Sequence, residues 1–466
     1  MTVHKRSRIG GTALAAAAAL LLAACSSSGG GSGSATASGA ASGASATSGS
    51  AAGALPSLKG KHLTVLAEWT GTEQTDFQAV LSSFEKQTGA SVSYQSGGSN
   101  TGTVLQTKIA GGAPPDVALL PEPGLITTLA QQGAIKPLSA AIQQEVAADY
   151  GPGWESMGTV GGKLYSVVYK ASDKTTFWYN TAEFNQAGIT PPSNWTQFLA
   201  DCQTLSDAGI TPVSVGGSDG WTLADWFQNI YLSEAGPAMY NKLAHHQIPW
   251  TSPSVIKALT TFGQLLGNQK YLVGGDAGAL QTSFNNSVTQ TFTTPPKAAM
   301  VFEGDFSATQ ITSTTKAKIG TDAKFFPFPG PATSSGASGG SSGFVQVAGD
   351  MATALNTDPA TMELIQYLAS PAADAIWAHE GGYLTPNKLV PLSDYPDATT
   401  QQEAQMLISA GTNVDFSLDD LSPAAFGGTV GAGYWKDMQD FLKDPANVEG
   451  TAKQLEADAS KVTWSS

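Results

Sequence analysis

Apolar segments of two kinds alternate along residues 62–120. The pattern predicts strands over residues 62–67, 90–94 and 116–120, with helical spacing at 77–84 and over about 103–110. Strands that alternate with helices indicate parallel, doubly wound sheets, in which ligands bind beyond the carboxyl ends of the strands. The side chains that follow the first and third strands are therefore candidates for a binding cleft: Glu68, Trp69 and Glu122.

Residues 173–184 separate this block from a second one with the same alternation. Residues 175–179 are all β-branched or aromatic, which favours a strand, and a helix is expected to begin near Ala182. We interpret the stretch as a crossing between two lobes, and the space between the lobes as the ligand cleft. Asp173 and Lys174 are candidate cleft residues because the crossing strand borders that space, and an ion pair that links the lobes is the alternative.

The second block supplies further strands and helices. Its pattern predicts strands over residues 210–215, 298–302 and 345–355, helices over about 195–205, 223–232 and 359–379, and a long helical region that ends near 272. Prolines make residues 325–331 extended, and we interpret this segment as the return crossing. The C-terminal residues are mainly helical and are expected to pack on the second lobe. Lobe 1 is assigned to residues 57–172 and 330–388, and lobe 2 to residues 173–329 and 389–466.

Acidic and aromatic side chains follow the predicted strands of the second lobe. Carboxylates can bind the hydroxyls of a sugar, and flat rings can stack on its apolar face. Asp219 and Trp221 come after one strand and a glycine turn, and Glu303, Asp305 and Phe306 come after another. The candidate ligand site of both lobes comprises Glu68, Trp69, Glu122, Asp173, Lys174, Asp219, Trp221, Glu303, Asp305, Phe306, Asp350 and Tyr383.

Several of these assignments have a structural alternative. Trp221 is the strongest candidate because it follows a strand and a glycine turn, but it can also begin a packed helix face with Trp226. Phe306 can equally be a core residue, and Glu303 and Asp305 can equally lie in a solvated turn.

Two later segments add weaker candidates. Asp350 lies within a predicted strand, and Tyr383 follows Gly382, whose missing side chain would let the backbone approach a ligand closely. Tyr434 and Trp435 can form a further aromatic wall of the cleft, although we favour a place in a helix core for both.

Composition and charge limit the classes of function. A chain of 466 residues exceeds one ordinary core, which agrees with two lobes. Only 13% of the residues are charged, and the formal net charge is −14. Residues 1–24 hold three basic residues and no acid, so their removal would leave −17. A balance of this sign disfavours nucleic acid and anionic membrane surfaces as partners.

Residues 1–24 have the features of an export signal. Three basic residues precede the apolar residues 13–22, which are too short and too rich in alanine for a membrane span. The following Cys25 completes a sequence that resembles the bacterial lipobox, which implies that Cys25 is lipidated; ordinary cleavage beside an incidental cysteine is the alternative. Residues 25–56 are mostly Ser, Gly, Ala and Thr and form a flexible tether. The remaining cysteine, Cys202, is expected to be a small buried hydrophobic residue.

Short motifs in a fixed order give the chain a family resemblance. They are the lipobox, Gly112–Val117, Gly162–Tyr165, Trp178–Asn180 with Phe184, Ala187–Pro192 with Trp195, and Tyr367–Pro371. With this order the chain resembles the bacterial extracellular solute-binding proteins of carbohydrate ABC importers, the family of the maltose- and α-glucoside-binding lipoproteins. The resemblance implies a two-lobed α/β fold of the periplasmic-binding-protein type, with hinge strands and a ligand cleft between the lobes. It also implies an exported, lipid-anchored monomer that delivers a sugar to a membrane permease without a cofactor or turnover.

A serine hydrolase is the main alternative function. Gly216–Gly220 satisfies G-x-S-x-G around Ser218, between a predicted strand and a helix, and His379 lies downstream. No HGGG-type oxyanion segment precedes the serine, and a chain with 52 glycines meets so short a motif easily. The solute-binding interpretation is therefore preferred.

Further alternatives rest on fewer residues. Glu303 and Asp305 could serve a glycosidase, but two carboxylates this close in sequence are a weak signal. Acids with aromatic rings also suit a polyamine. His245 and His246 are adjacent and point apart, and no cysteine or acid cluster joins them, so no metal site is expected.

Overall fold

Two β-sheets organise the protein. The computed structural model describes residues 55–331, 344–411 and 413–464. The predicted export signal, Cys25 and nearly all of the predicted tether lie outside the described residues.

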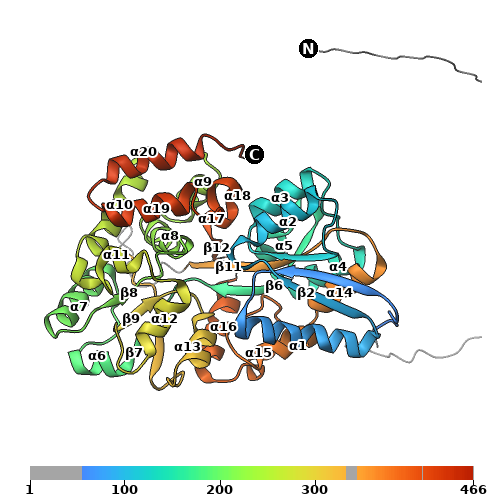
Figure 1. Ribbon diagram of the computed structural model, residues 1–466, viewed down its shortest axis with the longest axis horizontal. Helices are drawn as coiled ribbons and strands as arrows, with labels where there is room; N and C mark the ends of the chain where they lie inside the picture. Colours follow the sequence, from blue (N-terminus) through green and yellow to red (C-terminus); the bar gives the residue numbers. More distant parts are fainter. Residues whose placement is uncertain (1–54, 332–343, 412, 465–466) are drawn as a thin grey trace, which may run out of the picture. The chain divides into compact units, whose positions relative to one another are not determined.

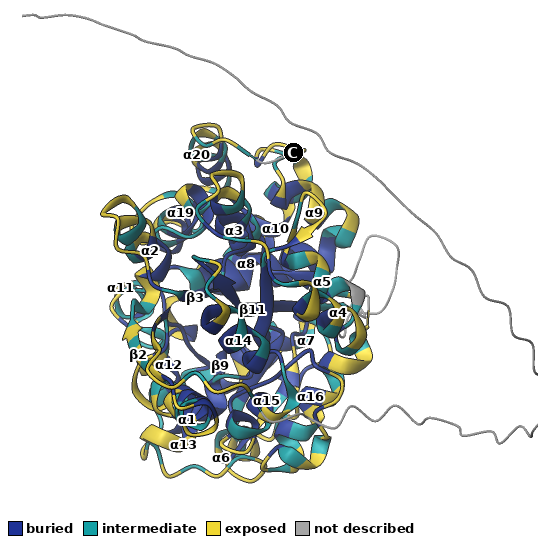
Figure 2. Cartoon of the chain, turned by 90° about the vertical axis from the view of Figure 1, so that its right-hand side faces the viewer, coloured by how far each residue is buried: buried dark blue, intermediate teal, exposed yellow. Residues whose placement is uncertain are grey.

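The first sheet has strand order β12-β11-β3-β1-β2, and β6 also pairs with β11. Neighbouring strands β1, β2 and β3 are parallel, as the sequence predicts, whereas β11 is antiparallel to both β3 and β6. Figure 2 shows β11 and β3 as buried strands with partly exposed helices around them. The strands are β1 (His62–Ala67), β2 (Ser91–Ser96), β3 (Val117–Leu120), β6 (Ser166–Asp173), β11 (Val345–Ala354) and β12 (Val414–Phe416).

The second sheet has strand order β10-β7-β9-β8. Successive side chains of a strand point to opposite faces, so Phe177 and Trp178 of β7 belong to different apolar clusters. Both faces of this sheet are therefore covered. The strands are β7 (Thr176–Asn180), β8 (Val213–Ser214), β9 (Met300–Phe302) and β10 (Ala323–Pro327); a separate two-stranded sheet joins β4 (Thr159–Val160) to β5 (Lys163–Leu164).

One set of helices packs in the core of the first sheet, which we call the first core. Figure 1 shows α1 along one side of this sheet and α2 and α3 on the other. The set comprises α1 (Gly71–Thr88), α2 (Thr101–Ala110), α3 (Pro123–Gln131), α4 (Ala140–Asp149), α5 (Pro152–Met157), α14 (Pro359–Leu368), α15 (Pro371–Ala378) and α16 (Ala398–Ala410), and short 3₁₀ turns occur at η1 (Gly98–Asn100) and η3 (Leu392–Asp394).

A second set of helices covers the second sheet. Most of them form the second core on one face, and α12 and α13 cover the other face. The set comprises α6 (Thr181–Ala187), α7 (Trp195–Asp207), α8 (Trp221–Ala235), α9 (Pro237–Ala244), α10 (Pro253–Leu266), α11 (Gly275–Ala279), α12 (Phe284–Phe292), α13 (Ser307–Thr314), α17 (Leu418–Leu421), α18 (Ala424–Gly427), α19 (Gly433–Lys443) and α20 (Val448–Ala459), with a 3₁₀ turn η2 (Gln269–Tyr271).

The chain passes between the two sheets through three segments. Strand β6 of the first sheet ends at Asp173 and β7 of the second begins at Thr176, where the sequence predicts a crossing. The chain returns between β10 and β11, and the proline-rich residues predicted for this crossing begin as strand β10. Ser417 forms the third segment, because β12 lies in the first sheet and Leu418 of α17 lies in the second core.

Two sequence predictions differ from this fold. The helix predicted over residues 359–379 is two helices, because Pro371 cannot continue the hydrogen bonding of α14 and instead begins α15, with Ser370 as its N-cap. Residues 389–466 were assigned to the second lobe, yet Ala404 and Phe416 pack in the first core. The second core receives this C-terminal part of the chain only from Leu418 onward.

Among residues 55–331, 344–411 and 413–464, no helix combines the length and the apolar character that a membrane crossing requires.

Candidate functional site

A cavity of about 340 Å³ opens between elements of both sheets. Its walls hold five aromatic side chains, seven carboxyl groups and two lysines. The lining residues are Glu68, Trp69, Thr70, Glu73, Gly98, Ser99, Thr101, Pro121, Glu122, Lys170, Ser172, Lys174, Asp219, Trp221, Ser283, Phe284, Asn285, Phe306, Ala348, Gly349, Asp350, Asp419, Asp420 and Trp435.

Three carboxyl groups lie on or just after neighbouring strands of the first sheet, and we call them the carboxyl row: Glu68, Glu122 and Asp350. Glu68 comes directly after β1, and Glu122 comes two residues after the end of β3, which is parallel to β1. Asp350 lies within β11, next to Met351, and Met351 pairs with the last residue of β3. Within the described residues, none of the three side chains makes a hydrogen bond, and Glu122 Oε2 and Asp350 Oδ1 are fully buried without a partner. Polar atoms left in this state call for donors from a ligand or from water.

The carboxyl row is electrostatically crowded. The pKa of Glu122 is raised to about 8, mainly by burial and also by the nearby carboxyl groups of Glu68 and Asp419. Burial also raises the pKa of Asp350 to about 7, against the opposing effect of Lys170. The pKa of the half-buried Glu68 is raised well above its ordinary value by desolvation, Asp350 and Glu73. Near neutral pH the row therefore retains protons, so that it can both donate hydrogen bonds to a hydroxyl-rich ligand and accept them.

Each lysine of the cavity already has an acidic partner. Lys170 Nζ lies 2.5 Å from Glu73 Oε1 and 5.1 Å from the ring centre of Trp377. Lys174 Nζ lies 3.2 Å from Asp225 Oδ2 and 4.0 Å from Asp420 Oδ2. Burial alone would lower the pKa of both lysines, but these acids outweigh it and raise the pKa, so both stay charged. Neither lysine is thus available to neutralise the carboxyl row completely.

Three aromatic rings on the second-sheet side form a cluster that we call the aromatic trio: Trp221, Phe284 and Phe306. Trp221 and Phe284 are the first residues of α8 and α12, and Phe306 is the N-cap of α13. The ring centres lie 5.1 to 6.0 Å apart, and all three side chains are half-buried. Such rings offer an apolar surface on which the flat face of a ligand ring can stack.

A glycine sets the start of α8 and so the position of Trp221. Gly220 has φ of +81°, a conformation that other residues rarely adopt, and a Cβ there would lie 2.8 Å from Trp435 Cβ. Asp219 Oδ2 accepts a 2.7 Å hydrogen bond from the Phe284 N–H, which holds two members of the aromatic trio beside each other.

Most of the candidate residues from the sequence line this cavity: Glu68, Trp69, Glu122, Lys174, Asp219, Trp221, Phe306 and Asp350. Trp69 is only 2% exposed, and it packs edge to face against two rings, with 4.7 Å between its ring centre and that of Phe77 and 4.8 Å to that of Trp377. It is therefore mainly a core residue. Trp435, for which the sequence favoured the core, also lines the cavity, and its Nε1 donates to Asp419 Oδ2 at 2.8 Å. Tyr434 is fully buried in the second core.

Four candidates lie outside the lining, which corrects their assignment: Asp173, Glu303, Asp305 and Tyr383. Asp173 Oδ1 accepts a 2.8 Å hydrogen bond from the Thr175 N–H and shapes the crossing. Asp305 Oδ1 in turn accepts from the Asp173 N–H at 2.8 Å. Tyr383 is buried in the first core, where its hydroxyl contacts Tyr169 O at 2.8 Å.

Glu303 is 2% exposed and points into the interior instead of a solvated turn. Its backbone explains why, because its N–H donates to Thr176 O at 3.3 Å and its carbonyl accepts from Thr176 Oγ1 at 2.8 Å. These bonds continue the pairing of β9 with β7 past the end of the strand, so the backbone of Glu303 stays in the sheet and its side chain stays buried.

Several lining residues were missed in the sequence. Lys170 carries a usable signal, since a lysine that directly follows the apolar residues 167–169 of one strand must have a partner when the strand is buried. Glu73 falls in the first turn of the helix after β1, close to the predicted site. Asp419 and Asp420 follow β12, whose three residues are too short to predict as a strand.

The G-x-S-x-G segment does not form a catalytic triad. Ser218 Oγ donates to Asp219 Oδ1 at 3.1 Å, and within the described chain no histidine is among its hydrogen-bond partners. His379 is exposed at the end of α15, a helix of the first core, whereas Ser218 follows β8 in the second sheet.

Comparison with known proteins gives consistent similarities. The sequence model of the family described as "Bacterial extracellular solute-binding protein" matches residues 68–375. The "Osmoprotective compounds-binding protein GgtB" of Synechocystis is 33% identical over 82% of this chain and 89% of its own. The "Alpha-glucosides-binding periplasmic protein AglE" of Rhizobium meliloti is 30% identical over 85% of this chain and 86% of its own.

Solved structures show the same fold. The bacterial solute receptor AcbH matches with a TM-score of 0.74 at 19% identity, over 86% of this chain and 99% of its own. The maltose-bound MalE3 of T. maritima matches with a TM-score of 0.66 at 16% identity, over 86% and 100%. The fold is therefore the mixed α/β fold of periplasmic binding proteins, as the sequence predicted.

Proposed function

We propose, since the chain belongs to the bacterial extracellular solute-binding protein family, that it is the solute-binding component of an ABC transporter and that its solute is a sugar. Members of this family bind a solute for transport, so the chain is a binding protein and not an enzyme. The sugar is bound in the cavity between the two sheets and passed to the membrane permease.

The arrangement of the cavity walls carries this proposal. The carboxyl row on the first-sheet side offers hydrogen-bonding oxygens, and the aromatic trio on the second-sheet side offers apolar ring faces. A sugar ring has both complements, since its hydroxyls lie around the edge and its C–H groups form the faces. A sugar that fills the cavity would contact elements of both sheets and thereby favour the conformation in which the two sets of elements approach each other.

An α-glucoside is the first candidate within the sugar class. This choice is supported by the similarity to AglE, whose description names α-glucosides, along most of both chains. Asp219 and Asp419 are held by hydrogen bonds from within the protein, whereas the carboxyl row is not. We therefore propose that the carboxyl row contacts the sugar hydroxyls directly and that Asp219 and Asp419 shape the site.

A lipid anchor on Cys25 would keep the protein at the outer face of the cell membrane. The basic and apolar residues before Cys25 and the lipobox-like sequence support this proposal. Residues 26–56 would then act as the tether between the anchor and the folded chain.

A polyamine is the second candidate ligand, because seven carboxyl groups and two lysines leave the cavity acidic. Against it, the raised pKa values of Glu122 and Asp350 remove much of that charge near neutral pH. An uncharged sugar suits such a site better than a multiply charged cation.

Calorimetric titration of Trp221→Ala tests the proposal. Methyl α-D-glucoside, maltose and trehalose serve as titrants, with spermidine as the competing class. Loss of the stacking surface is expected to weaken sugar binding by about 1–3 kcal/mol, or about 5- to 150-fold in Kd. Trp464→Ala is the matched control, because Trp464 is a half-buried tryptophan of the second core outside the cavity. Unchanged affinity in Trp221→Ala would contradict the site, and binding of spermidine alone would contradict the sugar.

A further inference from the structure

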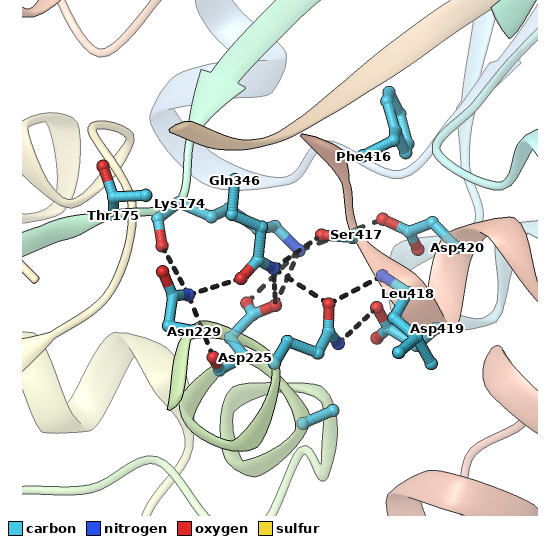
Figure 3. Close-up of polar contacts among 12 residues, drawn as sticks. Lys174, Thr175, Asp225, Asn229, Gln346, Phe416, Ser417, Leu418, Asp419 and Asp420 are labelled. Atoms are coloured by element: carbon cyan, nitrogen blue, oxygen red, sulfur yellow. Dashed lines mark hydrogen bonds and ion pairs between the residues drawn. The ribbon is translucent and has the colours of Figure 1, made fainter. Parts of the chain in front are cut away.

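The three segments that connect the two sheets meet at one buried residue, Gln346. Gln346 is the second residue of β11 and is 0% exposed. Its Nε2 lies 3.1 Å from Ser417 Oγ in the third segment, and its backbone carbonyl accepts a 2.9 Å hydrogen bond from the Lys174 N–H in the first. Gln346 lies at the start of β11, where the second, returning segment joins the first sheet, so a single residue links all three segments (Figure 3).

The same side chain contacts helix α8 of the second core. Gln346 Nε2 lies 3.2 Å from Asp225 Oδ1 and 2.9 Å from Gln228 Oε1, and its Oε1 accepts a hydrogen bond from Asn229 Nδ2. Asp225, Gln228 and Asn229 are all buried. Every polar atom of the Gln346 amide therefore has a partner, and the geometry fixes both the position and the orientation of the amide.

Lys174 connects this network to the cavity. Its carbonyl accepts a 3.0 Å hydrogen bond from Asn229 Nδ2, and its Nζ contacts both oxygens of Asp225, at 3.2 and 3.4 Å. Asp225 is thus shared between the Gln346 amide and the Lys174 ammonium. The ammonium also lies 5.4 Å from the ring centre of Trp221, at the edge of the aromatic trio. Of these network residues, Lys174 lines the cavity and Gln346, Asp225 and Asn229 do not.

We propose that Gln346 is a positioning residue for the ligand site, because it holds Asp225 and through it the Lys174 ammonium, and ties that ammonium to the three connecting segments. This inference rests on the proposed function, because that function places the ligand in the cavity. The hydrogen bonds and the ion pair that support the inference do not depend on which solute binds. A shift of the connecting segments would move Lys174 within the cavity, and a ligand held by Lys174 would in turn restrain all three segments.

The experiment is a double-mutant cycle of Gln346→Leu and Lys174→Gln, measured by titration with maltose, methyl α-D-glucoside and trehalose. Gln346→Leu is expected to weaken sugar binding about tenfold when Lys174 is present and less than twofold in the Lys174→Gln background, because the effect acts through Lys174. An equal loss in both backgrounds would overturn the proposal. Asn229→Ala, which removes one branch of the network, replaces Gln346→Leu if the latter does not fold.

Asn387→Ala is the matched control for general destabilisation. Asn387 is also a buried amide, but it bonds only within the first core, where its Nδ2 donates to Ala369 O at 3.1 Å. Its replacement is expected to lower the free energy of unfolding without a change in sugar affinity. A tenfold loss of affinity in Asn387→Ala would show that destabilisation alone explains the result, and would overturn the proposal.

A readout without ligand separates this inference from the proposed function. The ammonium N–H signal of Lys174 in nitrogen-15 NMR, assigned by its absence in Lys174→Gln, reports whether the group is held in place. Gln346→Leu is expected to broaden or shift this signal, and Asn387→Ala is expected to leave it unchanged. An unaltered signal in Gln346→Leu would overturn the positioning role, whereas failure of every sugar to bind would overturn only the proposed function.

Discussion

Replacement of Asp374 by asparagine is expected to change how the stability of the protein depends on pH. Asp374 lies in the first turn of α15, is 0% exposed, and accepts a 2.5 Å hydrogen bond from the Tyr383 hydroxyl through Oδ1. Burial raises its pKa from 3.8 to about 8, although hydrogen bonds from Tyr383, Thr385 and Asn387 act in the opposite direction. At neutral pH the native protein therefore holds this carboxyl in its protonated form.

The sign and size of the effect follow from this difference in proton affinity. Because the pKa of Asp374 is higher in the native state, the native state binds more protons than the unfolded chain between pH 4 and pH 8. The stabilising contribution is complete below about pH 4 and is lost as the pH rises through 8. One group of this kind lowers the free energy of unfolding by about 1.4 kcal/mol for each pH unit in this interval. Over the whole interval the decrease is at most about 6 kcal/mol.

Asparagine keeps the shape of the side chain but does not titrate in this interval. The difference in unfolding free energy between Asp374→Asn and the unchanged protein should therefore grow in favour of the variant from pH 5 to pH 8, by about 1.4 kcal/mol per unit. Urea denaturation at half-unit intervals of pH measures it. Asp444→Asn, a replacement at an exposed position, is the control and should give parallel curves. Parallel curves for Asp374→Asn as well would refute the reasoning, because they would show that this carboxyl does not change its protonation on unfolding.

Three further predictions concern the cavity. Lys170→Met should lower the free energy of unfolding by about 3 kcal/mol in urea denaturation, because it leaves Glu73 beside the buried acids without its cation; full stability would contradict the importance of the pair. Maltose affinity should rise between pH 6.5 and 9, since an ionised Glu122, with pKa about 8, accepts stronger hydrogen bonds, and calorimetry on Glu122→Gln should show a flatter profile. Gly220→Ala should lower both thermal stability and sugar affinity, because its φ is +81° and the added Cβ meets Trp435; an unchanged melting temperature would argue against the strain.

The sequence predicts much of this site because one topological rule holds locally. Strands β1 and β3 are parallel neighbours, so the residues after them meet at the same edge of the sheet, and Glu68 and Glu122 line the cavity together. The same rule holds after β8, where Asp219 and Trp221 reach the cavity across a glycine turn. In both places a short loop follows the strand at once and brings these side chains to the cavity.

The rule fails where tertiary pairing continues beyond the strand. Glu303 and Asp305 follow β9, but Thr176 binds the backbone of Glu303, and the N–H of Asp173 occupies Asp305 Oδ1. Both acids are therefore taken up by the connection between the sheets instead of the cavity. No local pattern in residues 303–306 distinguishes them from Phe306, which does reach the cavity, because the distinction is made by residues more than 100 positions away.

The charged residues that the sequence did not identify share a physical property: each has its partner far along the chain. Lys170 pairs with Glu73 across 97 positions, and Asp419 accepts a hydrogen bond from Gln228 across 191. A buried charge is tolerated only with such a partner, so an isolated charge within an apolar run predicts that a partner exists without saying where. The carboxyl row is the opposite case, since two of its members, Glu122 and Asp350, keep a buried oxygen without a partner within the described chain. A charged group that is paired within the protein stabilises the walls of the cavity. A polar group without a partner in a cavity wall can instead form hydrogen bonds with a ligand. We therefore expect the carboxyl row, and not Lys170, to determine which sugar binds.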